Sequence, residues 1–450
     1  MAKKTLASHQ RYASSMMDWT DCLGLAYDPG TGKTATALDY LYRARQRGEI
    51  GNALILCPPK MISSWHQSVR KMLTFEGYTE EGVDDLEGIL TITSYQRTFK
   101  SETRKYIDRS GRQRTRRTIR LREELNHPWD VIIIDESHRI GAHDSAQTDA
   151  TIKLGLLAQR RFVMSGTAVL GGGGHADYQK LYGQVKFLND AEFRNWTEFK
   201  GRYVKSVNWF GSITAYHEDR CRALLQKYFI IARRRDCFDL PPMAEHVIEC
   251  PLAEPDVFED IREGRLAKYN LDITAAGGQY PKLLQICSGH LICDDPEPLT
   301  LKCSKDEAVN DILDSTDGKV IIFCRFRASI DRVAGILDKR REDYRVFDGR
   351  SKTDTWRDVQ EGDARVLVVQ YQAGGEGLDL YAADLMIFFE PTLSSLQLEQ
   401  AKARIMRKGQ TKPCDYYYLV TPVEIERNTV DSVRRGVDVT AQMLDEWAKM

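Results

Sequence analysis

A glycine-rich turn near the N-terminus has the residue types and spacing of a phosphate-binding loop. It reads Asp28-Pro29-Gly30-Thr31-Gly32-Lys33-Thr34 and lies between an apolar run and a segment of helical composition, 35–45. Glycines let backbone N–H groups approach phosphates, a lysine reaches the β- and γ-phosphates, and a threonine hydroxyl ligates Mg²⁺. A chance turn before a helix is the alternative, which the strand–GxGKT–helix context disfavours. We predict that ATP is bound by Gly30, Thr31, Gly32, Lys33 and Thr34, with Lys33 catalytic and Thr34 a Mg²⁺ ligand.

Two adjacent carboxylates follow the apolar run 131–134, in the sequence Asp135-Glu136-Ser137-His138. If the run is a buried strand, its carboxyl end presents both. Such a pair can merely cap the next helix, but its place about a hundred residues after a phosphate loop favours catalysis. We predict that Asp135 holds Mg²⁺ and that Glu136 orients and deprotonates the attacking water. We expect His138 to hydrogen-bond towards a neighbouring motif, and the coupling residues of the first half are His138, Ser165 and Thr167.

The second half contains a glycine motif, Gly374-Gly375-Glu376-Gly377-Leu378-Asp379-Leu380, and two arginines, Arg404 and Arg407. Three positions apart on a helix, the arginines share one face and could contact the γ-phosphate of a nucleotide bound by the first half. A solvated helix face is the alternative. Hydrolysis at a site split in this way depends on closure of two lobes, and closure and reopening can become steps along a track.

The elements that must position these motifs are short apolar runs alternating with longer helical patterns. Buried parallel strands have this composition, and the helices between them cover both faces of a sheet. Two series imply two α/β domains. The runs are 24–28, 53–58, 90–95, 131–136, 161–166 and 228–233 in the first half, and 319–324, 344–349, 365–370, 385–391 and 415–421 in the second.

Leu240-Pro241-Pro242 marks the expected boundary, because two prolines interrupt regular structure. We predict an ATP-binding lobe over 1–238 with a helical insertion at about 170–225. The second lobe is predicted over 239–450, with a helical insertion at about 255–300 and a C-terminal helix at about 423–448.

Charge is balanced over the 450 residues, with 64 Lys+Arg against 65 Asp+Glu. A nucleic-acid-binding surface must therefore be local. The segment 97–122 holds eleven Lys/Arg and only two Asp/Glu. It is either a solvated surface loop or a contact to a phosphate backbone, and we favour the contact. Its assigned residues are Arg112, Arg114, Arg116 and Arg117.

Ten scattered cysteines show no disulfide framework, which is typical of a reducing compartment. Cys287, His290, Cys293 and Cys303 could bind zinc, but they lack paired CxxC knuckles and we favour buried thiols. No apolar run approaches the ~18 residues that span a bilayer, and no signal core follows the N-terminus. We expect a monomeric cytoplasmic protein, nuclear in a eukaryote, that binds no membrane.

Taken together, the motifs resemble those of superfamily-2 helicase-like ATPases of the Swi/Snf type, which are DNA translocases. Asp135-Glu136-Ser137-His138-Arg139-Ile140 resembles the DExH-Arg element of that family. Arg233-Arg234-Arg235 with Leu240-Pro241-Pro242 resembles the inter-lobe junction that separates it from DEAD-box RNA helicases. The resemblance covers nearly the whole chain and implies two tandem RecA-like lobes with helical insertions.

The resemblance also assigns roles to single residues. It implies that Gln10 reads adenine, that Gly377 and Asp379 face the ribose, and that Arg407 is the arginine finger, in a last motif that includes Gln400 and Arg404. The residues that it places against DNA are Pro58, Lys60, Ser94, Tyr95, Gly374 and Gly375.

The predicted function is therefore an ATP- and Mg²⁺-dependent motor that moves along or remodels double-stranded or branched DNA. One alternative is a strand-separating helicase on DNA or RNA, which an extra β-hairpin wedge would favour and the sequence does not indicate. Another is a nucleotide-gated clamp with little turnover, against which Glu136 and Arg407 argue.

Overall fold

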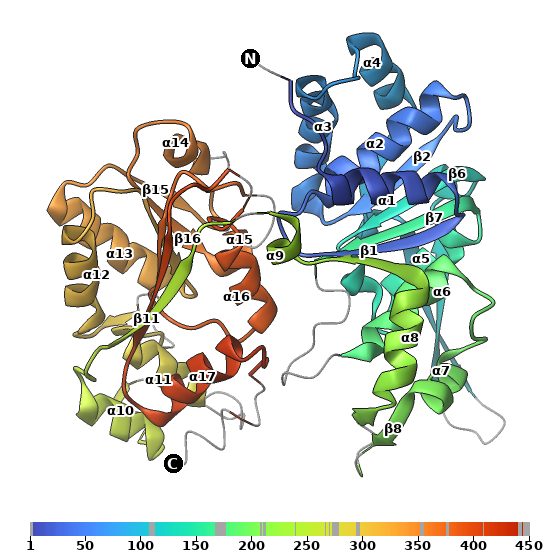
Figure 1. The fold of residues 1–450 in the computed structure, drawn as a ribbon. Coiled ribbons are helices and arrows are strands. Elements are labelled where there is room, and N and C mark those ends of the chain that lie inside the picture. The colour runs from blue at the N-terminus through green and yellow to red at the C-terminus, as the bar shows by residue number, and fades with distance from the viewer. Residues whose placement is uncertain are drawn as a thin grey trace. The chain divides into compact units, whose positions relative to one another are not determined.

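The structure, a computed structural model, divides after Phe238 into two compact units (Figure 1). It describes residues 3–107, 113–166, 177–207, 209, 213–238, 240–265, 267–269, 271, 279–293, 298–351, 355–374, 378–407, 409–439 and 443. Leu240-Pro241-Pro242 follows the division directly.

The first unit is built on a parallel six-stranded sheet in the order β10-β1-β7-β6-β2-β3. Its central strands are buried on both faces, as the run of apolar residues predicted. All six apolar runs predicted in the first half form this sheet. The strands are β1 (Cys22–Tyr27), β2 (Ala53–Cys57), β3 (Leu90–Ser94), β6 (Trp129–Asp135), β7 (Ala158–Ser165) and β10 (Phe229–Ala232).

Helices cover both faces of this sheet because alternate strand residues point to opposite sides. Ile55 and Ile133 pack into one core, whereas Leu54 and Ile132 pack into the other. The first core is closed by α1 (Ser8–Asp18), α2 (Lys33–Gln46), α3 (Ile62–Lys71) and α4 (Glu80–Ile89). The second is closed by α5 (Ala146–Gly155), α6 (Leu181–Leu188), α7 (Trp196–Tyr203) and α8 (Glu218–Tyr228).

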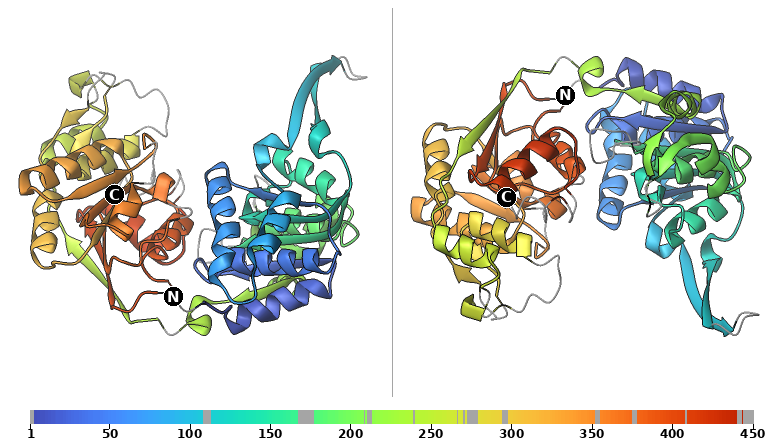
Figure 2. Two further views of the ribbon diagram at one scale, coloured as in Figure 1. Left: turned by 90° about the horizontal axis from the view of Figure 1, so that it is seen from above. Right: turned by 90° about the horizontal axis from the view of Figure 1, so that it is seen from below.

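Two hairpins of the first unit correct the sequence analysis. The basic segment 97–122, for which a surface loop was the alternative to a nucleic-acid contact, contains an antiparallel pair, β4 (Phe99–Ile107) and β5 (Gln113–Leu121). Figure 2 shows this pair projecting from the body of the unit. The segment predicted as a purely helical insertion contains β8 (Val204–Val207) and β9 (Ile213–Tyr216) between its helices.

The second unit has its own parallel six-stranded sheet, in the order β11-β18-β17-β14-β16-β15. The tandem parallel-sheet fold class predicted from the sequence is thus confirmed. One strand, β11 (Met243–Glu249), escaped prediction because it is a half-exposed edge strand with charged residues. The other five were predicted: β14 (Val320–Cys324), β15 (Tyr344–Phe347), β16 (Val366–Gln370), β17 (Leu385–Phe388) and β18 (Cys414–Val420).

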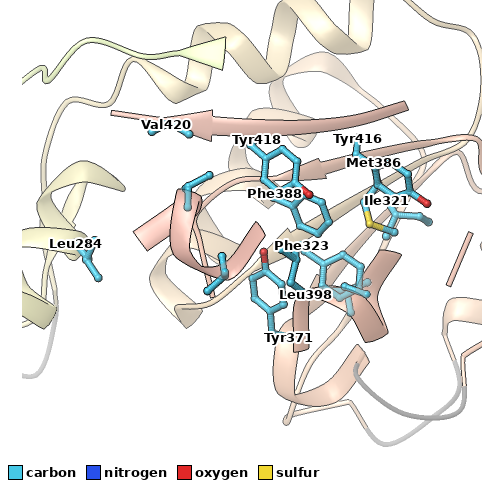
Figure 3. Packing of buried hydrophobic residues seen from close by; sticks show 14 of the residues in the cluster. Leu284, Ile321, Phe323, Tyr371, Met386, Phe388, Leu398, Tyr416, Tyr418 and Val420 are labelled. Carbon is cyan, nitrogen blue, oxygen red and sulfur yellow. The ribbon is translucent and has the colours of Figure 1, made fainter. Parts of the chain in front are cut away.

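Two cores lie against this second sheet. One consists of aromatic and aliphatic side chains, among them Phe323, Tyr371, Phe388 and Tyr418 (Figure 3). Its helices include α10 (Pro255–Arg262), α11 (Gln279–Cys287), α14 (Trp356–Gln360), α15 (Tyr371–Gly374), α16 (Ser395–Lys402) and α17 (Glu424–Arg434). The other core holds α12 (Lys305–Asp314) and α13 (Arg327–Arg340). A short pair, β12 (His290–Leu291) and β13 (Leu299–Thr300), adds strands to the predicted insertion.

The C-terminal helix is shorter than predicted. It ends at Arg434, and Gly436 then adopts a φ of 84°, which terminates the helix. Among the described helices, none combines the length and apolar composition needed to span a membrane.

The four residues weighed as a zinc site lie around β12. Within the described residues, no three His, Cys, Asp or Glu side chains gather as a set of metal ligands. Cys287 is buried, and burial raises the pKa of its thiol well above the usual value.

Candidate active site

The glycine-rich turn joins β1 to α2, as predicted. Gly30 and Gly32 adopt φ values of 85° and 88°, in the left-handed region that favours glycine. Gly32 is the N-cap of α2, and no side chain within the described chain caps that end. The N–H groups of the first helical turn have no partners within the helix, so they form a site for phosphate.

Lys33 is held over this turn. Its Nζ donates to the backbone oxygen of Tyr27 at 3.0 Å. Gly166, at the end of β7, lies beside the loop, because a Cβ there would be 3.1 Å from the ring of Pro29 and 3.5 Å from Nζ of Lys33. The Ser165-Gly166 motif therefore adjoins the phosphate-binding loop through Gly166.

The N-terminal helix braces the turn from a second side. The Nε2 amide of Gln10 donates to the Thr31 oxygen at 3.0 Å, and Nε2 of His9 lies 2.8 Å from the same oxygen. A side chain at Gly32 would collide with the Gln10 amide. Gln10 is thus linked to the loop, and its role in reading adenine remains a prediction.

An anchor that the sequence analysis missed comes from the start of α9 (Arg234–Cys237). The Arg234 N–H donates to the Asp28 carboxylate at 2.8 Å, and its Nε donates to the Pro29 oxygen at 3.1 Å. The Asp28 N–H in turn donates to the Ala232 oxygen at 3.0 Å. The only sequence signal was the Arg-Arg-Arg run, which indicated a junction and not this contact.

Asp135 ends β6 with its carboxylate almost fully buried, at 1% exposure. Its oxygens accept from Nε1 of Trp65 and from the Glu136 N–H, both at 2.9 Å. Burial, followed by the neighbouring Glu136 charge, raises the pKa of Asp135 to about 7, and Lys33 opposes this rise. A buried carboxylate next to another is a site that a cation would stabilise.

Glu136 and His138 form a short polar chain from this strand end. Nδ1 of His138 lies 3.3 Å from Oε2 of Glu136 and 3.1 Å from Oγ of Ser165. His138 therefore contacts the neighbouring motif that the sequence analysis named. Coupling through it stays a prediction, and Thr167 lies outside the described residues.

The donor set fits a nucleotide with Mg²⁺. A hard cation takes carboxylate and hydroxyl oxygens together with substrate phosphates. Asp135 supplies a buried carboxylate with lone pairs to spare, and the half-buried Thr34 is in the first turn of α2. These two residues remain the predicted Mg²⁺ ligands.

In the second unit, both predicted arginines contact the end of the glycine motif. Nη1 of Arg404 and Nη1 of Arg407 donate to the Leu378 oxygen at 3.2 and 3.0 Å. Arg407 also forms an ion pair with Asp379. The predicted shared helix face is wrong, because α16 ends at Lys402 and turns follow it. The two guanidinium groups converge because both donate to the backbone oxygen of Leu378.

The other predicted residues of this unit are more dispersed. Gln400 lies in α16 and is 8% exposed. Gly374 ends α15, where a side chain would collide with Val369 and approach Phe323. Gly375 and Gly377 lie outside the described residues.

The residues predicted to contact DNA in the first unit differ in exposure. Lys60 is exposed, whereas Pro58, Ser94 and Tyr95 are buried. The Tyr95 hydroxyl donates to the backbone oxygen of Asp135, so this side chain also supports the catalytic strand. Arg114, Arg116 and Arg117 are positions of β5, and Arg112 lies outside the described residues.

Comparisons with known proteins match both units to known families. A model of the SNF2-related domain matches residues 11–258, and one of the helicase conserved C-terminal domain matches residues 304–409. DNA repair protein rhp54 of Schizosaccharomyces pombe is 23% identical over 94% of this chain and 55% of its own length. The probable global transactivator of Orgyia pseudotsugata multicapsid polyhedrosis virus is 22% identical, over 90% of this chain and 83% of its own.

The chain thus spans about half the length of the first of these relatives. Among solved structures, the Sulfolobus solfataricus SWI2/SNF2 ATPase core in complex with dsDNA is 18% identical, covers 98% of each chain and has a TM-score of 0.43.

Proposed function

We propose that this chain, which belongs to the SNF2-related family, is an ATP-hydrolysing motor that moves along duplex DNA. One observation supports this most strongly. A glycine loop at a helix N-terminus, a lysine, the buried carboxylate of Asp135 and the partly buried one of Glu136 belong to one unit, and Lys33 is close enough to Asp135 to oppose the rise of its pKa. Phosphoryl transfer needs this set of groups.

Each group of the first unit has a defined task in the proposed reaction. The N-terminus of α2 and Lys33 bind the phosphates, while Asp135 and Thr34 would hold Mg²⁺. Mg²⁺, when bound, neutralises charge on the β- and γ-phosphate oxygens. Glu136 accepts the proton of the attacking water, and Nδ1 of His138 lies 3.3 Å from the Glu136 carboxylate.

We assign Arg404 and Arg407 of the second unit to the charge that develops on the transferred phosphoryl group. Because Arg407 pairs with Asp379 in this structure, it must exchange that carboxylate for phosphate in order to act. Asp379 therefore has a second proposed role beside ribose binding, which is to hold the arginine finger between turnovers.

Duplex DNA is the proposed track because the chain matches the SNF2-related domain over 11–258 and a relative is named as a DNA repair protein. ATP hydrolysis is measured with blunt duplex, forked duplex, single-stranded DNA and RNA at several salt concentrations. We expect the strongest stimulation with duplex-containing DNA. Stimulation by RNA alone contradicts the proposal.

Lys33→Ala and Glu136→Gln serve as inactive references in this assay. Each removes a group that acts on the transition state and not a core side chain, so turnover is lost while the fold is kept. Wild-type turnover in either variant means that the site is assigned wrongly.

A second candidate function is strand separation, which requires an extra β-hairpin, and β4–β5 is such a hairpin. Release of a strand from a tailed duplex, dependent on ATP, tests it.

A further inference from the structure

We propose that the β4–β5 hairpin is an arm that grips duplex DNA through the face of the ribbon that carries Lys100 and Arg120. The identity of the bound polyanion rests on the proposed function. This proposal narrows the predicted nucleic-acid contact of segment 97–122 to one face of the hairpin and to two residues, Lys100 and Arg120, that were not among those assigned to DNA.

The hairpin is anchored to the first unit, because one face of its base packs against α5. Ile119, at 8% exposure, packs with Phe99 and Leu121 against Ala146 and Ala150 of α5. In addition, Nζ of Lys153, on α5, donates to the Ile119 oxygen at 2.7 Å. These contacts fix the direction in which the ribbon leaves the unit.

The root of the ribbon also connects to the catalytic strand. The Arg122 N–H donates to the Thr98 oxygen at 3.0 Å, and the buried Thr98 hydroxyl donates to the Tyr95 oxygen at 2.7 Å. The Tyr95 hydroxyl reaches the backbone oxygen of Asp135. Hydrogen bonds therefore link the base of the arm to the strand that carries the catalytic carboxylates.

The opposite face of the ribbon brings like charges together. The register pairs Lys100 directly with Arg120, and both side chains are exposed. In the described part of the chain neither forms an ion pair. The next pair on the same face is Glu102 opposite Thr118, and the register then places Arg104 opposite Arg116. Like charges directly opposite each other destabilise a sheet, and a bound anion removes that cost.

The size and charge of the ribbon match a duplex. Nine residue pairs form it, which at ~3.4 Å per residue gives about 30 Å of length. Two strands ~5 Å apart fit the major groove, which is about 12 Å wide and admits such a ribbon. The segment 97–122 has eleven basic and two acidic residues in a chain of net charge −1, so the positive charge is concentrated here.

The composition favours a grip over a wedge. Side chains that part stacked bases are large and apolar, such as Phe, Leu, Ile or Met. The sequence between the two strands is Asp108-Arg109-Ser110-Gly111-Arg112, which contains no such residue.

The test compares full-length wild type with the double variant Lys100→Gln/Arg120→Gln. The matched control is Lys302→Gln/Lys339→Gln, which removes two exposed lysines of the second unit. Affinity for blunt duplex DNA is measured at several salt concentrations. Each phosphate contact contributes about 0.9 to the slope of log affinity against log salt. We expect the hairpin variant to lose about 2 from this slope, with affinity at least about tenfold weaker at low salt, and the control to match wild type.

An unchanged slope in the hairpin variant overturns the proposal, and so does an equal loss in the control. Normal duplex affinity with loss of strand release from a tailed duplex also overturns it and identifies a wedge. Thermal unfolding of both variants verifies that the fold is kept. If no DNA stimulates ATP hydrolysis by wild type, the proposed function is wrong. If duplex DNA stimulates wild type but the salt slopes of wild type and the hairpin variant agree, only the proposal of a DNA-gripping arm is wrong.

Discussion

Glu136 combines a catalytic assignment with backbone strain. It adopts φ 52° and ψ 48°, and the only other non-glycine residue of the described chain with positive φ is Arg341, which ends α13. A non-glycine residue in this region costs about 1–2 kcal/mol. Strain of this kind persists where function requires it, and here it turns the chain sharply between β6 and the following Ser137–Ile140 turn.

Substitutions at Glu136 separate strain from chemistry. We expect Glu136→Gly to abolish ATP hydrolysis while raising the free energy of unfolding by up to about 1 kcal/mol, because glycine adopts this conformation without a clash. Glu136→Val should lower that free energy by about 1 kcal/mol, since a β-branched residue fits this region poorly. Urea unfolding and ATPase assays give both quantities. A glycine variant less stable than wild type contradicts this account.

His290 makes the stability of the second unit depend on pH. It is 4% exposed, and burial lowers its pKa to about 4. Between pH 6.5, the ordinary value, and pH 4, the unfolded chain binds a proton that the folded chain does not. The free energy of unfolding therefore falls as the pH falls through this window, by up to about 3 kcal/mol.

Replacing His290 by Gln removes the titrating ring. We expect the plot of unfolding free energy against pH to be flatter between pH 6.5 and 4 than in wild type, even if the variant is less stable at pH 8. Urea unfolding at a series of pH values measures this. If the plots for wild type and the variant are parallel, groups other than His290 cause the loss of stability in acid.

At the residue scale, local motifs predicted the groups that act on phosphate, because their spacing is short and their context is a strand end. The side chains that support them were not predictable. Trp65, Tyr95 and Arg234 reach Asp135 or Asp28 from 40 to 206 positions away. Such contacts depend on the sheet order, which no local pattern encodes.

A buried ion pair ties α12 to α17. Nζ of Lys305 lies 2.6 Å from Oε1 of Glu426, and both side chains are fully buried. Oε2 of Glu426 also accepts the Thr421 N–H at 2.7 Å. With its oxygens bonded, the carboxylate is satisfied only while Lys305 is present.

Removing one partner leaves the other charge buried and unpaired. We expect Lys305→Met to lower the free energy of unfolding of the second unit by about 3–5 kcal/mol. The double variant Lys305→Met/Glu426→Leu should recover part of that loss, because no isolated charge remains. Urea unfolding of the single and double variants measures the coupling. Additive losses mean that the pair is not coupled as the geometry indicates.

At the element scale, the central strands of both sheets were predictable because continuous apolar runs characterise strands covered on both faces. The missed elements lack that signal. β11 is an edge strand in which Glu245, His246 and Glu249 interrupt the apolar residues. β4–β5 contains so many basic residues that its sequence gives no apolar strand signal. The turns at 403–407 were mistaken for helix because an arginine spacing of three fits either structure.

The whole molecule consists of two units, each with a parallel sheet between two cores of its own. The phosphate loop belongs entirely to the first. Ligand at about 100 times its Kd stabilises a folded protein by ~2.7 kcal/mol. We therefore expect ADP with Mg²⁺ to slow amide hydrogen exchange across β1 and β6 and not across β14 and β16. Exchange measured with Lys33→Ala is the control, and equal protection of both sheets contradicts the assignment.

The position of β10 beside β1 has a consequence for the newly made chain. The loop that follows β1 is tied to Ala232 and Arg234, and the Asp28–Arg234 contact joins residues 206 positions apart. At 5–20 residues per second, a ribosome needs roughly 10–40 s to make that stretch. During this interval one edge of β1 has no strand to pair with, and unpaired edges are prone to aggregate. The loop is thus among the first segments to be synthesised and among the last of its unit to be completed.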